Sequence, residues 1–325
     1  MDNDLESKAL FNPDEQLSIR IAWYYYITEM TQQQIADRFN VSRARVNKAL
    51  ANCRETGVVQ IRINSKLASC IRLEHELQER YGLREAIVVP VPPGNGNLLY
   101  RVLGAGAGPY FHDQLFEGCS VGVGWGRTLR HAVRQTRGRA FAGITIVSLM
   151  GGLNHGSGYN TIEIAHSLAR LFNGEYYYLA APVYMDSAVS RDTLLDQESI
   201  RNVYQRAQKV DMALVTVGDL SRRSLMLELG LLRPEDARAL RAAGAVGDLL
   251  GHCLDADGQE VDHPFNQRVI ALSLEDLGRI RKVILVSGGA DKTAILRAVL
   301  RRGLIHVLIV DEATAQALTA DPASE

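Results

Sequence analysis

The chain has 325 residues, of which 46% are hydrophobic and 22% are charged, and its formal net charge at neutral pH is −1. These values are typical of a globular protein with two or three domains. No basic, apolar signal segment and no apolar window of about 18 residues is present, so we expect a cytoplasmic protein that does not contact a membrane.

The cysteines indicate the same compartment. Cys53, Cys70, Cys119 and Cys253 form no C-x-x-C pair, and none lies beside a histidine at metal-binding spacing. This pattern predicts reduced, structural thiols, without a metal site and without a cofactor.

Charge is distributed unevenly near the N-terminus. Residues 1–16 are acidic, and we expect a disordered lead-in there. Residues 17–66 carry eight basic side chains against three acidic ones, a net charge of +5. A basic unit on a neutral chain is the distribution that suits a phosphate backbone, so residues 17–66 are predicted to form a DNA-binding domain.

Residues 30–57 contain two helical patterns separated by a short turn. Thr31 and Gln34 form a capping box that starts the first helix, in which Ile35 and Phe39 are expected to be buried. Asn40 ends that helix, because asparagine tolerates the left-handed backbone that a tight turn requires.

The second helix begins after Ser42, its cap, and turns Val46 and Leu50 inward. A helix, a turn and a second helix with outward basic side chains predict a helix-turn-helix, with residues 42–54 as the recognition helix. The alternative is a pair of helices that simply pack together. The residues expected to contact DNA are Thr31, Gln32, Ser42, Arg43, Arg45, Asn47 and Lys48.

Two flanking segments complete the predicted head. Residues 15–30 are expected to form a helix that packs Leu17, Ile21, Trp23 and Tyr25 behind the pair. Residues 58–64 alternate apolar and polar side chains, which predicts a short strand as a wing.

Residues 67–83 are predicted to form a linker helix, with Cys70, Leu73, Leu77 and Tyr81 on one stripe. The stripe fits pairing with a partner subunit and fits packing on its own domain equally well.

Residues 84–325 alternate between strand and helix patterns, which predicts an α/β domain with a Rossmann-like parallel sheet and helices on both faces. A further strand is expected within residues 81–97. The apolar runs are residues 120–126, 144–152, 175–184, 210–218, 282–289 and 305–312, and the helical patterns are residues 160–172, 199–207, 234–243 and 290–302.

The sequence VGVGWGRT, residues 121–128, places Gly124 and Gly126 where a strand ends and Arg127 and Thr128 where a helix begins. Helix starts at the carboxyl ends of parallel strands bind anions, so we predict an anion site here. The glycine spacing is not the dinucleotide-binding G-x-G-x-x-G, and a plain tight turn is the alternative.

Three further polar residues are candidates. Lys292 follows Gly288-Gly289 in a helix start, where it either binds phosphate or forms a surface salt bridge with Asp291 or Glu312. Asn160 opens another helix after a glycine-rich loop. Asp248 lies on the first arm of a hairpin predicted around residues 257–258, where it either accepts from sugar hydroxyls or faces solvent.

The chain resembles the SorC family of sugar-responsive, DeoR-type bacterial transcriptional regulators. The resemblance is carried by the helix-turn-helix and by the ordered motifs VGVGWGRT, MGGL…NTIEIA, GAVGD…LDADG, VSGGADK and LIVDEATAQAL. It implies a winged DNA-binding head, a sugar-binding domain similar to sugar-phosphate isomerases, and homodimers or homotetramers on operator DNA. It also implies a phosphorylated sugar or polyol as effector, bound by Gly124, Gly126, Arg127, Thr128, Asn160, Asp248 and Lys292.

The alternative is an enzyme of the isomerase or deaminase type with an added helix-turn-helix. Such an enzyme needs a carboxylate pair and a base at the sugar's carbonyl carbon. The sequence assigns no such group, no G-x-S-x-G nucleophile elbow and no Ser/His/Asp order, so no catalytic residue is predicted.

Overall fold

A computed structural model describes residues 13–28, 30–59, 67–91, 96–154 and 158–320. The chain divides into two compact units, Met1–Ser65 and Lys66–Glu325. This division lies within one residue of the end that the sequence predicts for the head.

The smaller unit contains three helices in its described part, α2 (Pro13–Tyr26), α3 (Gln32–Phe39) and α4 (Arg43–Glu55). Residues 13 and 14, which precede the predicted helix of residues 15–30 and were expected in the lead-in, are therefore helical, and the helix ends at Tyr26 rather than at residue 30. Proline suits a first helical turn and the carboxylates of Asp14 and Glu15 suit the positive end of the helix dipole, so α2 begins earlier than predicted. Residues 1–12 lie outside the described part.

The core of the head is apolar and is shared by the three helices. Ile21, Ile35, Val46 and Leu50 are at most 2% exposed. The expectation for Trp23 is wrong, because its side chain is 59% exposed. Tyr24 packs instead, with its ring centroid 5.6 Å from that of Phe39. Most of the predicted wing, residues 60–64, lies outside the described residues.

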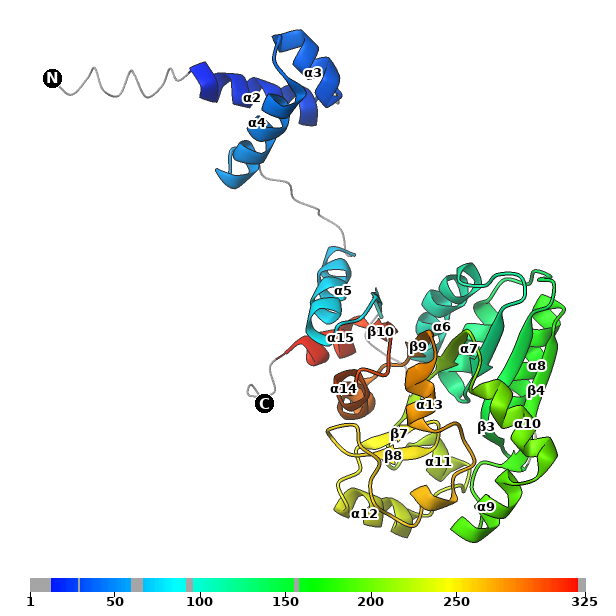
Figure 1. Cartoon of the computed structure of the whole chain (residues 1–325). Helices are drawn as coiled ribbons and strands as arrows, with labels where there is room; N and C mark the ends of the chain where they lie inside the picture. Colours follow the sequence, from blue (N-terminus) through cyan, green and yellow to red (C-terminus); the bar gives the residue numbers. More distant parts are fainter. Residues whose placement is uncertain (1–12, 29, 60–66, 92–95, 155–157, 321–325) are drawn as a thin grey trace. The chain divides into compact units, whose positions relative to one another are not determined.

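The larger unit is built on a parallel sheet of seven strands in the order β1-β10-β9-β5-β2-β3-β4, with a second, antiparallel sheet in the order β6-β7-β8. This confirms the predicted α/β class. Figure 1 labels β9, β10, β3 and β4 of the large sheet and β7 and β8 of the small one. The strands are β1 (Glu85–Val89), β2 (Ser120–Val123), β3 (Thr145–Gly152), β4 (Glu175–Pro182), β5 (Met212–Val215), β6 (Val217–Gly218), β7 (Gly247–Leu249), β8 (His252–Leu254), β9 (Lys282–Val286) and β10 (Val307–Asp311).

Helices cover both faces of the large sheet. One apolar cluster joins it to α6, α7 and α8, and another joins it to helices that include α5, α14 and α15. The helices are α5 (Ala68–Tyr81), α6 (Gly96–Asp113), α7 (Arg127–Gln135), α8 (Thr161–Phe172), α9 (Ala188–Leu195), α10 (Glu198–Ala207), α11 (Leu225–Glu228), α12 (Pro234–Ala242), α13 (Leu274–Arg279), α14 (Thr293–Arg301) and α15 (Glu312–Thr319), with 3-10 turns η1 (Asn266–Arg268) and η2 (Ala290–Lys292).

Two local predictions need correction. The hairpin that carries Asp248 turns at Leu250-Gly251, both of which have positive φ, rather than around residues 257–258. A single bridge between Leu254 and Glu260 does close a turn at the predicted place. Helix α6, which contains Pro109, was not predicted, because a glycine-rich segment with an internal proline lacks the usual marks of a helix.

Helix α5 packs on its own unit. Cys70, Leu73 and Leu77 are at most 2% exposed and belong to one apolar cluster with Ala315 and Leu318 of α15. Figure 1 shows α5 and α15 side by side. The apolar stripe of the linker is thereby used within the chain, which decides between its two interpretations.

All four cysteines are buried and free, as expected of structural thiols. In the described part of the chain, no helix combines the length and the apolar character that crossing a membrane requires.

Candidate functional site

The start of α4 and the turn before it are held by local hydrogen bonds. The Thr31 hydroxyl accepts from the Gln34 amide at 3.3 Å, and the Thr31 amide donates to the Gln34 side chain at 2.9 Å, which completes the predicted capping box. Asn40 has a left-handed backbone with φ 51°. The Ser42 hydroxyl accepts from the Arg45 amide at 3.2 Å, so α4 begins where the sequence predicts.

The polar side chains of α4 form an exposed surface. Arg43, Arg45, Asn47 and Lys48 are all exposed, on a helix whose other face is buried. Arg43 donates to the side chain of Gln32 at 3.4 Å, which joins the starts of α3 and α4. This surface is the candidate nucleic-acid interface.

Arg45 already has an acidic partner within the head. Its guanidinium lies 2.7 Å from the carboxylate of Asp14 in α2, and both side chains are more than half exposed. A base or phosphate that binds Arg45 must therefore compete with Asp14.

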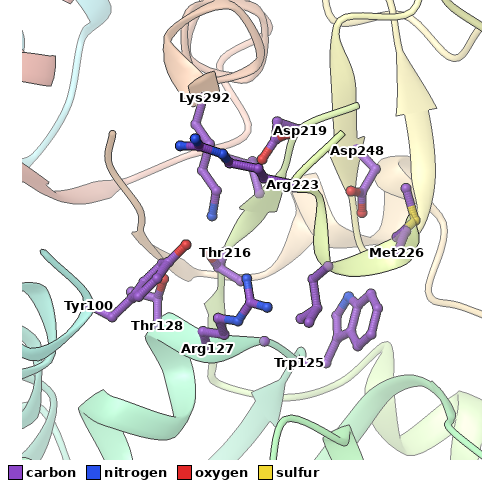
Figure 2. Close-up of a pocket in the computed structure, with 14 residues that line it drawn as sticks. Tyr100, Trp125, Arg127, Thr128, Thr216, Asp219, Arg223, Met226, Asp248 and Lys292 are labelled. Atoms are coloured by element: carbon purple, nitrogen blue, oxygen red, sulfur yellow. The ribbon is translucent and has the colours of Figure 1, made fainter. Parts of the chain in front are cut away.

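The larger unit has a pocket at the carboxyl ends of β9, β5 and β2, which are neighbours in the sheet. This is the edge at which open α/β sheets bind ligands. Figure 2 shows Lys292 extending toward Arg127 and Tyr100, with Asp248 and Trp125 at another side of the pocket. The lining residues include Tyr100, Trp125, Gly126, Arg127, Thr128, Thr216, Asp219, Arg223, Met226, Asp248 and Lys292.

The predicted anion site lies at the start of α7. Gly126 caps this helix with φ 119°, a backbone conformation that favours glycine. Thr128 is buried in the first turn. The Arg127 guanidinium forms an ion pair with Glu228 of α11 and lies 5.6 Å from the centre of the Tyr159 ring. An anion at this helix start would compete with Glu228 for Arg127.

The pocket also contains two carboxylates, Asp248 and Asp219, and the ammonium group of Lys292. Asp248 is 2% exposed, and burial raises the pKa of its carboxyl to about 6 although the Gly251 amide donates to it at 3.0 Å. Burial lowers the pKa of Lys292, and the nearby carboxylates of Asp219 and Asp248 oppose that shift. Asp248 therefore faces the pocket's charged groups and is not a solvent-facing aspartate.

Lys292 lines the pocket, and its ammonium lies 6.0 Å from the centre of the Tyr100 ring. Within the described residues it forms no ion pair with Asp291 or Glu312, the partners of the alternative interpretation.

Gly124 and Asn160 do not line the pocket. The Gly124 amide donates to the Leu214 carbonyl at 3.1 Å, and a Cβ atom there would lie 3.1 Å from Leu250, so this glycine serves packing. Asn160 is 5% exposed, and its side chain is bonded to the amides of Ile162 and Leu153 and to the Leu153 carbonyl. Its amide group is used to start α8.

The pocket is also lined by Tyr100, Trp125, Asp219 and Arg223, which no sequence pattern had indicated. Tyr100 comes from the unpredicted helix α6, and Asp219 and Arg223 follow the short strand β6. Trp125 lies between Gly124 and Gly126, inside the motif VGVGWGRT, and this position next to the predicted anion site could have indicated it.

The comparisons with known proteins cover nearly the whole chain. A family model described as "Putative sugar-binding domain" matches residues 65–320. The deoxyribonucleoside regulator of Bacillus subtilis is 34% identical over 310 residues, which are 94% of this chain and 98% of that protein. The chain belongs to the SorC family of transcriptional regulators.

Other similar proteins agree in sequence and in fold. The erythritol catabolism regulatory protein EryD of Brucella abortus is 29% identical over 95% of this chain and 98% of its own length. The structure of the full-length sorbitol operon regulator SorC from Klebsiella pneumoniae has a TM-score of 0.73 over 95% of this chain and all of that chain, and at 24% identity it supports the fold alone. The expected transcriptional regulator with a sugar-binding domain is thereby confirmed.

Proposed function

We propose that this SorC-family protein binds operator DNA through the exposed face of α4 and that a phosphorylated sugar or polyol in the pocket controls this binding. The regulated genes would serve carbohydrate or polyol catabolism. The names of the relatives support this proposal, because they include regulators of deoxyribonucleosides and of erythritol catabolism.

The head supports DNA binding through its charge and geometry. Arg43, Arg45, Asn47 and Lys48 project from the first half of α4, the part of a recognition helix that enters the major groove. Arginine and asparagine pair with guanine and adenine edges, and lysine suits phosphate. Because one small head reads only a half-site, we propose a homodimer or homotetramer on the operator.

The observation that carries the effector half of the proposal is that the pocket holds cationic groups and carboxylates together. Arg127, Lys292 and the start of α7 offer positive charge and helix amides to an anion. Asp248 and Asp219 offer acceptors to hydroxyl groups nearby. A molecule with a phosphate at one end and hydroxyls at the other complements both kinds of group.

A second candidate function is favoured by one feature of the pocket. A carboxyl group whose pKa is about 6, in a pocket that also holds another carboxylate and a lysine, has the properties of a general base for sugar isomerisation. The names of the relatives favour sensing over catalysis. A general base that removes a carbon-bound proton from a sugar phosphate lets that position exchange with solvent. Incorporation of solvent deuterium into the sugar phosphate, followed by NMR, would therefore demonstrate catalysis.

The main proposal is tested with sugar and polyol phosphates and with their unphosphorylated parents. The phosphate that fits is expected to raise the melting temperature at concentrations where its parent compound does little, because only the phosphate gains the anion site. It is also expected to change the affinity for DNA from the region upstream of the protein's own gene.

The Arg127→Ala/Thr128→Ala variant removes the side chains of the anion site. It should lose both responses while DNA binding in the absence of ligand survives. A parent sugar that stabilises the protein as well as its phosphate, together with a double variant that still responds, would show that the phosphate site is misplaced.

A further inference from the structure

The motif LIVDEATAQAL, residues 308–318, contributes to the family resemblance but does not line the pocket. Its aspartate, Asp311, ends β10 and is 4% exposed. One oxygen accepts from the Thr314 amide at 3.1 Å and starts α15. The other accepts from the Thr314 hydroxyl at 2.6 Å and from the Gly289 amide at 2.9 Å. A single buried carboxylate therefore joins a helix start to a turn 22 residues away.

The Gly288-Gly289 turn is shaped around Asp311. A Cβ atom on Gly288 would lie 2.1 Å from the Asp311 carboxylate oxygen, which no side chain could tolerate. Gly289 has φ 100°, and its amide also lies 2.8 Å from the Thr314 hydroxyl oxygen. The turn continues directly into Lys292. The turn lines a second cavity, which shares Tyr100, Arg127 and Lys292 with the pocket described above.

The next residue of the motif connects to the linker helix. Glu312, the first residue of α15, accepts from the Ser69 hydroxyl at 2.6 Å. Ser69 lies in the first turn of α5, four residues after the last residue of the head unit. At the other end of α5, the Tyr81 hydroxyl donates to the Leu318 carbonyl at 2.9 Å. Both ends of α5 are thus fixed to α15.

We propose that Asp311 is a positioning residue for the effector site, and that Asp311 and Glu312 connect the Gly288-Gly289 turn to the first turn of α5. The turn and α5 then share one hydrogen-bonded support, so a change in one alters the stability of the other. This inference rests on the proposed function only for the identity of the ligand. Coupling between two sites requires an element whose state both sites influence, and the start of α15 is the candidate because it is hydrogen-bonded both to the turn and to α5.

Hydrogen–deuterium exchange of the full chain without ligand tests the connection directly. The reporters are peptides covering residues 286–292 and 68–77. The first contains the Gly289 amide, and the second contains the Ile71 amide of α5, which donates to the carbonyl of the helix cap Leu67. Asp311→Asn is expected to raise exchange at least tenfold in both peptides. Thr314→Val removes the hydroxyl that donates to Asp311 and accepts from the Gly289 amide, so it should do the same to a smaller extent and serves if Asp311→Asn does not fold.

Two variants separate this connection from general destabilisation. Ser69→Ala should raise exchange in the 68–77 peptide alone. Ser273→Ala, which removes the cap of α13 at the amino-terminal side of β9, should change neither peptide. The proposal is overturned if Asp311→Asn affects the 286–292 peptide alone, or if it raises exchange equally throughout the larger unit.

Inorganic phosphate, measured by calorimetry, tests the positioning role. Asp311→Asn should weaken phosphate binding at least tenfold, whereas Ser69→Ala should change it by less than twofold. An unchanged phosphate affinity in Asp311→Asn would overturn the positioning role. If the unaltered chain binds no phosphate, the proposed anion site fails, and the exchange rates without ligand still decide the connection.

Discussion

At the scale of single residues, the pocket contains ionisable groups, Asp248 and Lys292, whose charged forms are disfavoured by burial. Asp248 is nearly inaccessible to solvent, with Lys292 and His252 favouring its ionised form and Asp219 opposing it. Burial is the largest influence and raises the pKa of the carboxyl from 3.8 to about 6. Such groups accumulate at functional sites, because a binding pocket requires polar atoms where packing alone would place apolar ones.

Asp248→Asn should change how stability depends on pH. A raised pKa in the folded state means that the contribution of Asp248 to stability is complete below about pH 4 and is lost as pH rises through about 6. An asparagine side chain resembles the protonated carboxyl, so the variant should match the unaltered protein near pH 4. At pH 7.5 it should be more stable, by at most about 3 kcal/mol.

Urea unfolding at the two pH values measures this difference, with Asp257→Asn, an exposed aspartate, as the matched control. A variant that is less stable than the unaltered protein at pH 7.5 would show that ionised Asp248 contributes to folding.

The recognition helix carries a second prediction at this scale. Arg45→Ala and Asn47→Ala should each relax base preference, because these side chains suit base edges and a bidentate pair with the correct base contributes about 1–3 kcal/mol of discrimination. Lys48→Ala should weaken binding to all sequences alike and reduce its salt dependence. Selection from a randomised operator measures both effects.

Asp14→Asn is the matched control for Arg45. It removes the exposed partner of Arg45, and such pairs contribute about 0–1 kcal/mol, so DNA affinity should rise by at most about fivefold. If both alanine variants keep the base preference of the unaltered protein, α4 is not the recognition helix.

At the scale of elements, short-range rules account for the head. The Thr31 and Ser42 caps and the left-handed Asn40 act within four residues of their own positions, so the α3–turn–α4 unit can be predicted without knowledge of its neighbours. The inner strands of the large sheet are similar, because they are buried on both faces and appear as continuous apolar runs, whereas the edge strand β4 is largely exposed.

Substitutions of Asn40 test the turn. Asn40→Ala should destabilise the head by about 1–2 kcal/mol, because a Cβ-bearing residue without a local hydrogen bond is unfavourable at φ 51°. Asn40→Gly should be close to neutral. Urea unfolding followed by the fluorescence of Trp23, in a Trp125→Phe background, reports on the head alone. Equal stability of the two variants would mean that the turn adopts another backbone conformation in solution.

At the scale of the whole molecule, the two units have separate cores and separate candidate sites. The head offers a small polar surface on α4. The larger unit offers a pocket, and its helix α5 is fixed to α15 of the same unit. Because affinity for an operator rises when two half-sites are bound together, we expect the larger unit to supply the oligomeric contacts.

Removal of residues from Leu67 onward should leave a folded head that binds operator DNA much more weakly than the full chain. Fluorescence anisotropy measures the affinity, and circular dichroism checks that the head is folded. Fusion of the head to an unrelated dimerising helix should recover part of the affinity. An isolated head that binds as tightly as the full chain would exclude the need for oligomerisation.

The sequence by itself determined the class of fold, the helix-turn-helix and the position of the α7 start, because periodicity and caps act over a few residues. It also indicated Arg127, Thr128, Asp248 and Lys292 as a set, although it did not show that they line one pocket.

Only the tertiary structure decided which polar groups are available to a ligand. Asn160 is used by its own helix start and Gly124 by packing, whereas Arg127 is held by Glu228, 101 residues away. The Asp311–Gly289 contact spans 22 residues and the Ser69–Glu312 contact spans 243. Such contacts depend on the order of strands in the sheet, which brings distant segments together, and no local pattern in the sequence records that order.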